Sequence, residues 1–226
     1  MDFWRSLETL RARHDVLRHP FYVRWSAGEL SRSELAHYSG QYRHAVVALA
    51  GAAAQAAAAV DPALDAGLRA ELDAHAAEEA AHIALWDGFC AAVGGSATAT
   101  PAPETTDCTR AWAPETGRPL LRSLVALHAI EAAQPAIAAT KRIGLATHYG
   151  LANGPATAYF ELHERRDVEH AASSRELIAE RLEAEPTQSQ PSERELRALL
   201  DEAEAVLRGN WRLLDGVERV ASGGCR

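Results

Sequence analysis

Cysteine is scarce in this 226-residue sequence, and its three copies, Cys90, Cys108 and Cys225, lie far apart along the chain. Thiols that are few, odd in number and unclustered argue against a zinc–cysteine site and indicate a reducing compartment. The expected location is therefore the cytoplasm. Lysine is rarer still, because of the 23 basic residues only Lys141 is a lysine. A GC-rich genome explains a general preference for arginine, but it does not explain why one lysine remains at this position.

Long hydrophobic runs are absent as well. The nearest candidate, residues 46–60, is rich in alanine, contains Gln55 and is shorter than the about 20 apolar residues that span a membrane. The first 15 residues mix charged and apolar side chains, so no signal peptide is expected. A net charge of -8 argues against nucleic acid as the main partner, since phosphate binding requires a basic face. These absences predict neither a membrane nor a nucleic-acid partner.

Alternating strand patterns are also missing, and almost the whole chain has helical periodicity. The interpretation is an all-α bundle of about seven helices in a single domain over residues 1–226. Ser31 and Glu34 form an expected capping box, and Pro135 is expected to kink a helix. Residues 96–117, rich in proline and threonine, are expected to be a long ordered loop or lid. The expected helices cover residues 2–18, 21–31, 32–59, 62–93, 118–150, 150–183 and 192–220.

Polar residues on the helical faces that should be buried are the first sign of a site, because burying them unpaired is costly. On the helix around residues 73–86, His75, Glu78, Glu79 and His82 share one face. The pair Glu79 and His82 has the acid-x-x-His spacing of carboxylate-bridged di-iron bundles. A solvated polar stripe on an alanine-rich helix would give the same pattern.

Two further helices carry similar residues. Glu131 is the only acid between Arg118 and Arg142, and it stands among aliphatic side chains. In the segment HERRDVEH, His163, Asp167 and His170 fall on one helical face. Either helix taken alone is also compatible with an exposed polar surface. The helix with His163, Asp167 and His170 is highly charged, and a charged helix can give such a triple without a metal site.

Together, these residues form a more specific pattern than any one helix does. The candidate metal ligands comprise three carboxylates and three imidazoles: Glu79, His82, Glu131, His163, Asp167 and His170. Carboxylate and imidazole ligands without thiolate suit iron or manganese in an O₂-activating centre, whereas zinc usually takes a smaller, tetrahedral set. The residue types do not separate a Fe/Fe from a Fe/Mn centre.

With these ligands, the sequence resembles the heme-oxygenase-like di-metal oxidases, and more narrowly the CADD-type p-aminobenzoate synthases. The resemblance is densest in residues 19–30, 82–86, 131–145 and 158–171. It implies a heme-oxygenase-like helical fold, O₂ as co-substrate, an external reductant and a product that feeds folate synthesis. It also implies that the enzyme consumes its own chain, with Tyr22 as the source of the ring, Lys141 as the amino donor and Tyr38 as a second aromatic nearby. A lysine is chemically suited to that role because arginine cannot replace a primary amine.

The sequence departs from the CADD-type pattern at two positions. An ungapped match places His75, and not a glutamate, at the acid position of the first ligand helix, so Glu79, Glu78 and His75 all remain candidates there. The residue before Glu131 is Ile130, where the CADD-type proteins have tyrosine.

Two other functions remain open. A di-metal oxidase could instead act on an external fatty acid, amino acid or amine, by oxidative C–C cleavage or N-oxygenation. A helical protein of the same fold without metal, such as a thiaminase-like hydrolase, would need a cysteine nucleophile, and only Cys90 and Cys108 are near a loop. The sequence shows no obvious symmetric interface and leaves a homodimer open.

Overall fold

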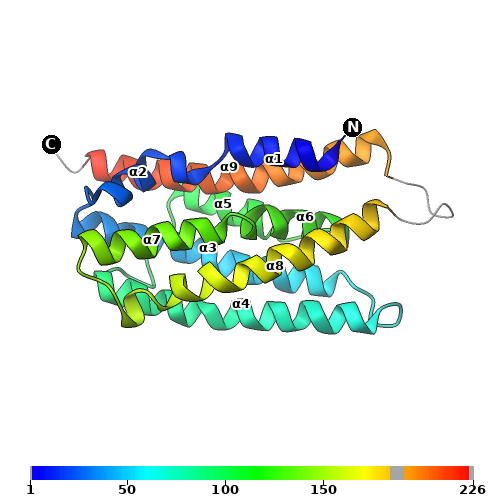
Figure 1. Ribbon diagram of the computed structural model, residues 1–226, viewed down its shortest axis with the longest axis horizontal. Helices are drawn as coiled ribbons and strands as arrows, with labels where there is room; N and C mark the ends of the chain where they lie inside the picture. Colours follow the sequence, from blue (N-terminus) through cyan, green and yellow to red (C-terminus); the bar gives the residue numbers. More distant parts are fainter. Residues whose placement is uncertain (1, 184–190, 224–226) are drawn as a thin grey trace.

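The computed structural model describes residues 2–183 and 191–223, which form helices and turns without any strand. The helical elements cross one another in a layered bundle (Figure 1). Their bounds are α1 Phe3–Arg13, η1 Val16–Arg18, α2 Pro20–Ala27, α3 Arg32–Ala58, α4 Ala66–Val93, α5 Pro103–Trp112, α6 Leu120–Glu131, α7 Gln134–His148, η2 Gly154–Ala156, α8 Ala158–Leu182 and α9 Glu193–Gly223. The all-α prediction is confirmed.

Local sequence signals explain several helix ends. The capping box predicted at the start of α3 is present, with the Ser31 and Glu34 side chains each bonded to the other's backbone N–H. The next long helix, α4, begins later than expected, since Asp65 and not the region of Pro62 caps its first turn. An acceptor side chain at this position satisfies a backbone N–H that otherwise lacks a partner.

Pro135 stands at the start of a helix instead of kinking one. The helix α6 stops at Glu131, and α7 starts at Gln134 with the proline in its first turn, where its missing N–H is tolerated. The predicted helix over residues 118–150 is therefore two helices. The break makes Glu131 the last helical residue of α6.

The long ordered loop or lid expected over residues 96–117 contains a helix at its centre. Residues Pro103–Trp112 form α5, which packs against α3 and α9. Gln41 holds its start, because its side-chain oxygen accepts hydrogen bonds from the Ala102 N–H and the Thr105 hydroxyl. With Cys108 and Trp112 buried, this segment belongs to the core and does not cover it as a lid.

The core lies between three sets of helices. In Figure 1, α9 runs along α1 and α5 on one side, α4 lies on the opposite side against α3, and α8 crosses between α7 and α4. Large aromatic side chains fill the centre, including the fully buried Trp25, Trp86 and Trp112. No helix among the described residues is long and apolar enough to cross a membrane.

The contact between α2 and α7 depends on a glycine. A Cβ on Gly144 would lie 2.6 Å from the indole ring of Trp25, whose Nε1 donates a hydrogen bond to the Lys141 carbonyl at 3.1 Å. This close approach holds α2, which carries Tyr22, against α7, which carries Lys141.

Gly144→Ala is therefore expected to destabilise the protein by about 1–3 kcal/mol, because the buried indole must move. The measurement is the free energy of unfolding from urea titration. Gly67→Ala is the matched control, since its Cβ would have no neighbour nearer than 3.6 Å and alanine favours the helix. Equal stability of Gly144→Ala and the wild type would show that the approach is not tight.

Candidate metal centre

Helix α4 directs only part of its polar face inward. Glu79 is 1% exposed and His82 is buried, whereas His75 is partly buried and Glu78 lies nearer the surface. The Glu78 carboxylate turns to Arg166 of α8, which donates two hydrogen bonds to it at 2.7 and 2.9 Å. Among the candidates on this helix, the structure thus brings Glu79, and not Glu78, to the centre of the bundle.

Helix α6 supplies one carboxylate. Glu131 is fully buried at the last residue of the helix, directly before the break at Pro135. Its Oε1 lies 2.9 Å from Nε2 of His75. Burial raises the pKa of Glu131, since desolvation disfavours its charged form, while His75 acts in the opposite direction.

Helix α8 turns the predicted triple inward. His163, Asp167 and His170 are all buried, although neighbouring residues on the helix are charged and exposed. His163 Nδ1 donates a hydrogen bond to the Tyr159 carbonyl at 2.8 Å, which leaves Nε2 to face the cluster. The prediction that these three residues share one buried face is confirmed.

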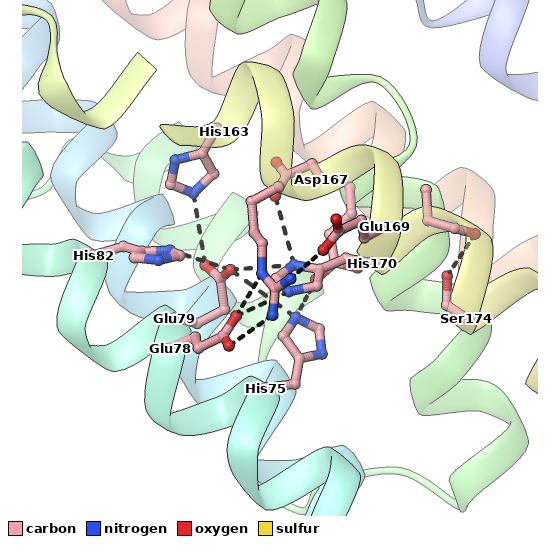
Figure 2. Close-up of polar contacts among 12 residues, drawn as sticks. His75, Glu78, Glu79, His82, His163, Asp167, Glu169, His170 and Ser174 are labelled. Atoms are coloured by element: carbon pink, nitrogen blue, oxygen red, sulfur yellow. Dashed lines mark hydrogen bonds and ion pairs between the residues drawn. The ribbon is translucent and has the colours of Figure 1, made fainter. Parts of the chain in front are cut away.

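Glu79 lies at the middle of the cluster (Figure 2). Its Oε1 is 3.3 Å from His82 Nδ1 and 3.7 Å from His170 Nδ1, and its Oε2 is 3.8 Å from His163 Nε2. Two overlapping groups could each hold a metal ion, and Glu79 is common to both. They are His75, Glu79, Glu131 and His170 on one side, and Glu79, His82 and His163 on the other.

The cluster contains many buried polar atoms without a hydrogen-bond partner. They include both carboxylate oxygens of Glu79, Glu131 and Asp167, and one ring nitrogen each of His75, His82, His163 and His170, although some of these atoms, such as Glu131 Oε1 and His75 Nε2, lie within ion-pair distance of one another. Leaving such groups unpaired typically costs 1–3 kcal/mol each, and more when they are charged. Lone pairs that converge without donors are what a bound cation would satisfy, so these residues fit a metal centre.

The electrostatics of the cluster favour positive charge. Burial acts to lower the pKa of His170, but the carboxylates of Asp167, Glu131 and Glu79 outweigh it and raise the pKa to about 9. The pKa of His163 is raised in the same way, since Glu79 and Asp167 outweigh its burial. Without metal, protons on these rings supply the compensating charge, and metal binding would release them.

His75 is the residue that the predicted ligand set left out. Its ring stands 4.1 Å from the His170 ring, measured between centroids, and it belongs to the same candidate group as Glu131. The signal was its helical spacing, four residues before Glu79 and seven before His82. The sequence treated His75 and Glu79 as alternatives, whereas the structure brings both to the cluster.

A second buried cluster contains the proposed reactive residues Tyr22, Tyr38 and Lys141. The two phenols share a hydrogen bond of 2.9 Å between their hydroxyl oxygens. Lys141 is 1% exposed, and its Nζ lies 5.3 Å from the centre of the Tyr22 ring and 5.6 Å from that of Tyr38. Tyr42, Trp86 and Phe160 complete the aromatic surroundings of the amine, at 4.5, 5.4 and 5.4 Å.

The cysteines do not form a nucleophilic site in the described part of the chain. Cys90 and Cys108 are buried free thiols, and burial raises the pKa of both. Nucleophilic cysteines have the opposite shift, since the thiolate is the reactive form. Cys225 lies outside the described residues. This geometry gives no support to a thiaminase-like reading.

Comparison with known proteins identifies the family. The model of the TENA/THI-4/PQQC family matches residues 7–207, so the chain belongs to this family. It is 32% identical over 188 residues to a 4-aminobenzoate synthase of Chlamydia muridarum, which covers 79% of this chain and 78% of the relative. A 4-aminobenzoate synthase of Nitrosomonas europaea is 30% identical over 225 residues, covering 92% of this chain and 87% of the relative.

Solved structures confirm the fold predicted from the resemblance. A protein from Shewanella denitrificans, described as having a heme oxygenase-like fold, superposes with a TM-score of 0.77 at 17% identity. The match covers 98% of this chain and 94% of the other chain. The chain therefore has a heme-oxygenase-like fold.

Metal binding by the cluster is testable with the metal-free protein. Co(II) added without oxygen is expected to raise the melting temperature of the wild type, because a ligand that binds only the folded state stabilises it. In Glu79→Gln both candidate metal groups lose a carboxylate oxygen. Loss of a residue that only supports a metal ligand costs roughly 10- to 100-fold in metal affinity, so the cobalt affinity of Glu79→Gln is expected to fall by more than that.

The control for this measurement is Glu176→Gln, which makes the same carboxylate-to-amide replacement at an exposed glutamate of α8. It should keep the full cobalt-dependent rise in melting temperature. Equal cobalt affinity in Glu79→Gln and Glu176→Gln would contradict a metal centre built around Glu79.

Proposed function

We propose that the protein is an O₂-dependent di-metal oxidase that makes p-aminobenzoate from its own chain. In this proposal Tyr22 supplies the aromatic ring and Lys141 supplies the amino group. The names of the two relatives that match most of the chain support the product. The proposed self-sacrificing chemistry depends on one observation above all, the burial of the only lysine of the sequence beside Tyr22.

The aromatic surroundings of Lys141 suit an amine that acts as a nitrogen donor. Desolvation lowers the pKa of Lys141 well below its usual range, because burial disfavours the charged ammonium and favours the neutral amine. A neutral amine has the free lone pair that a nitrogen donor requires, while a charged ammonium does not. The five rings around it also keep out water that would compete for a reactive carbon.

Tyr22 and Tyr38 are held for a joint role. Burial raises the pKa of Tyr22 well above its usual range, so its phenol remains protonated until it reacts. The Tyr38 hydroxyl, 2.9 Å away, fixes the orientation of that phenol and is positioned to exchange a proton with it. We assign Tyr22 as the ring donor and Tyr38 as its proton partner.

The two clusters are joined by aromatic contacts. The ring of Tyr159 stacks on His163 with centroids 3.9 Å apart, and the Trp86 ring lies 4.9 Å from Tyr159. Trp86 also lies 6.0 Å from the ring of Tyr38. These contacts support the proposal because they connect the candidate metal ligands with Tyr22 through a continuous layer of buried side chains.

Seven residues would hold the metal: Glu79, His82, Glu131, His163, Asp167 and His170, as the sequence predicts, together with His75. Two iron ions, or one iron and one manganese, would supply the oxidising power by activating O₂ with electrons from an external reductant. The chain's own contribution is to hold the ions with three carboxylates, to keep the Lys141 amine neutral and to orient the Tyr22 phenol.

Self-consumption predicts a distinctive stoichiometry. Protein loaded anaerobically with Fe(II), or with Fe(II) and Mn(II), and then given O₂ and a reductant should release p-aminobenzoate without any added substrate. The yield should not exceed about one molecule per chain, because each chain has one Tyr22 and one Lys141. Mass spectrometry of the small molecules and of the digested protein should localise the mass loss to Tyr22.

Substitutions separate the self-sacrificing reading from a reaction on an external substrate. Tyr22→Phe and Lys141→Arg should abolish the product, and Lys141→Met tests the amine without burying a permanent charge. Tyr149→Phe is the control, since that hydroxyl lies at the edge of the core and bonds only to backbone of Leu30 and Trp25. Repeated turnover by the wild type, or full yield from Lys141→Arg, would favour an external substrate instead.

A further inference from the structure

A cavity leads from the protein surface to the candidate metal centre between α4, α6 and α8. Its volume is about 240 Å³. The inner wall includes His75 and His170, two members of the candidate metal group, and Leu124 and Leu127 form an apolar side. His170 is buried, and its Nδ1 has no hydrogen-bond partner. The cavity therefore ends at two candidate metal ligands, His75 and His170.

The outer part of the cavity is acidic. Glu71, Glu78 and Glu169 line it, against the single guanidinium of Arg166. Glu71 accepts a hydrogen bond from Ser173 at 2.7 Å, so it is held toward the opening. A cleft with an excess of one charge concentrates ions of the other sign and speeds their association.

Glu78 connects the mouth of this cavity with its inner wall. Both oxygens of its carboxylate accept hydrogen bonds from Arg166, which also donates one to Glu169. Its Oε2 is also 3.2 Å from His170 Nε2. The Glu78 side chain is 38% exposed, so solvent ions can reach it.

We propose that this cavity is the path by which divalent metal ions reach the centre, and that Glu78 receives them while Arg166 closes the path. An arriving cation displaces Arg166 from the Glu78 carboxylate, because the same oxygens serve both partners. It then passes to His75 and His170, and from there to Glu79 and Glu131. When the centre is filled, the Arg166–Glu78 pair forms again and covers it. This path rests on the metal centre of the proposed function but not on the identity of the substrate.

The test is the rate of Co(II) uptake by the metal-free full-length protein, followed by the absorption of the bound ion after rapid mixing. Glu78→Gln should slow association roughly tenfold, within the range that charge steering provides, and should weaken its dependence on salt. Arg166→Gln should speed association, because the carboxylate is then free. Melting temperatures show that the variants are folded.

The ion pair of Arg142 and Glu164 provides matched controls. It also involves α8, with side-chain exposures of 34% and 31%, but neither residue lines this cavity. Glu164→Gln and Arg142→Gln should therefore leave the association rate unchanged. Equal slowing by Glu164→Gln would mean a general effect of surface charge and would overturn the path.

Two further outcomes separate the path from the centre itself. If Glu78→Gln changes only the rate of cobalt release to a chelator, Glu78 merely orients His170 and the path is wrong. If the wild type takes up no cobalt, the centre and the path both fail. A third outcome is that the wild type takes up cobalt, Glu78→Gln is slower and Arg166→Gln is faster, but the protein makes no p-aminobenzoate. This outcome would overturn the proposed reaction and leave the path standing.

Discussion

The compensation of buried charge is the constraint on which the rest of this structure depends. Glu79, Glu131 and Asp167 are almost fully buried in the centre of a helical bundle, and their oxygens lack donors. An uncompensated buried carboxylate is expensive, so the cluster requires positive charge from protons on its histidines or from metal ions. The elevated pKa of His170 expresses this requirement. A buried cluster that requires compensating positive charge could hold a metal ion.

The buried amine of Lys141 has surroundings opposite to those of the buried carboxylates. Lys141 lies among aromatic rings instead of carboxylates, so desolvation lowers the pKa of its amine and favours the neutral form. Arginine could not take this place, because its guanidinium remains charged. In the proposed reaction, the need for a side chain that can be buried without charge and act as a nitrogen donor accounts for the single lysine in an arginine-rich chain. The same core thus contains a cluster of buried carboxylates and imidazoles and, apart from it, a lysine surrounded by aromatic rings.

Several local features were predictable because short-range rules determine them. The capping box at Ser31 and Glu34 and the inward face formed by His163, Asp167 and His170 follow from helical geometry alone. The sequence of segment 96–117 does not reveal its helix, because α5 is short and polar, with two prolines near its start. Its helix is held by Gln41, which lies 61 residues before Ala102, and by packing on α9. Pro135 predicts an interrupted helix, but a kink within one helix and a complete break between two helices give the same sequence signal.

The sequence by itself determined the helical class, the carboxylate and imidazole chemistry of the centre and the singular position of Lys141. Periodicity and residue type suffice for these, since both act along one helix. Only the tertiary structure distinguished the positions of Glu78, Glu79 and His75, because the helical spacing of α4 puts all three on one face and neighbouring helices determine which of them is buried. Arg166 of α8 draws Glu78 to the surface, while Glu131 at the end of α6 meets His75. The choice was made by contacts between residues 56 or more positions apart, which no local pattern records.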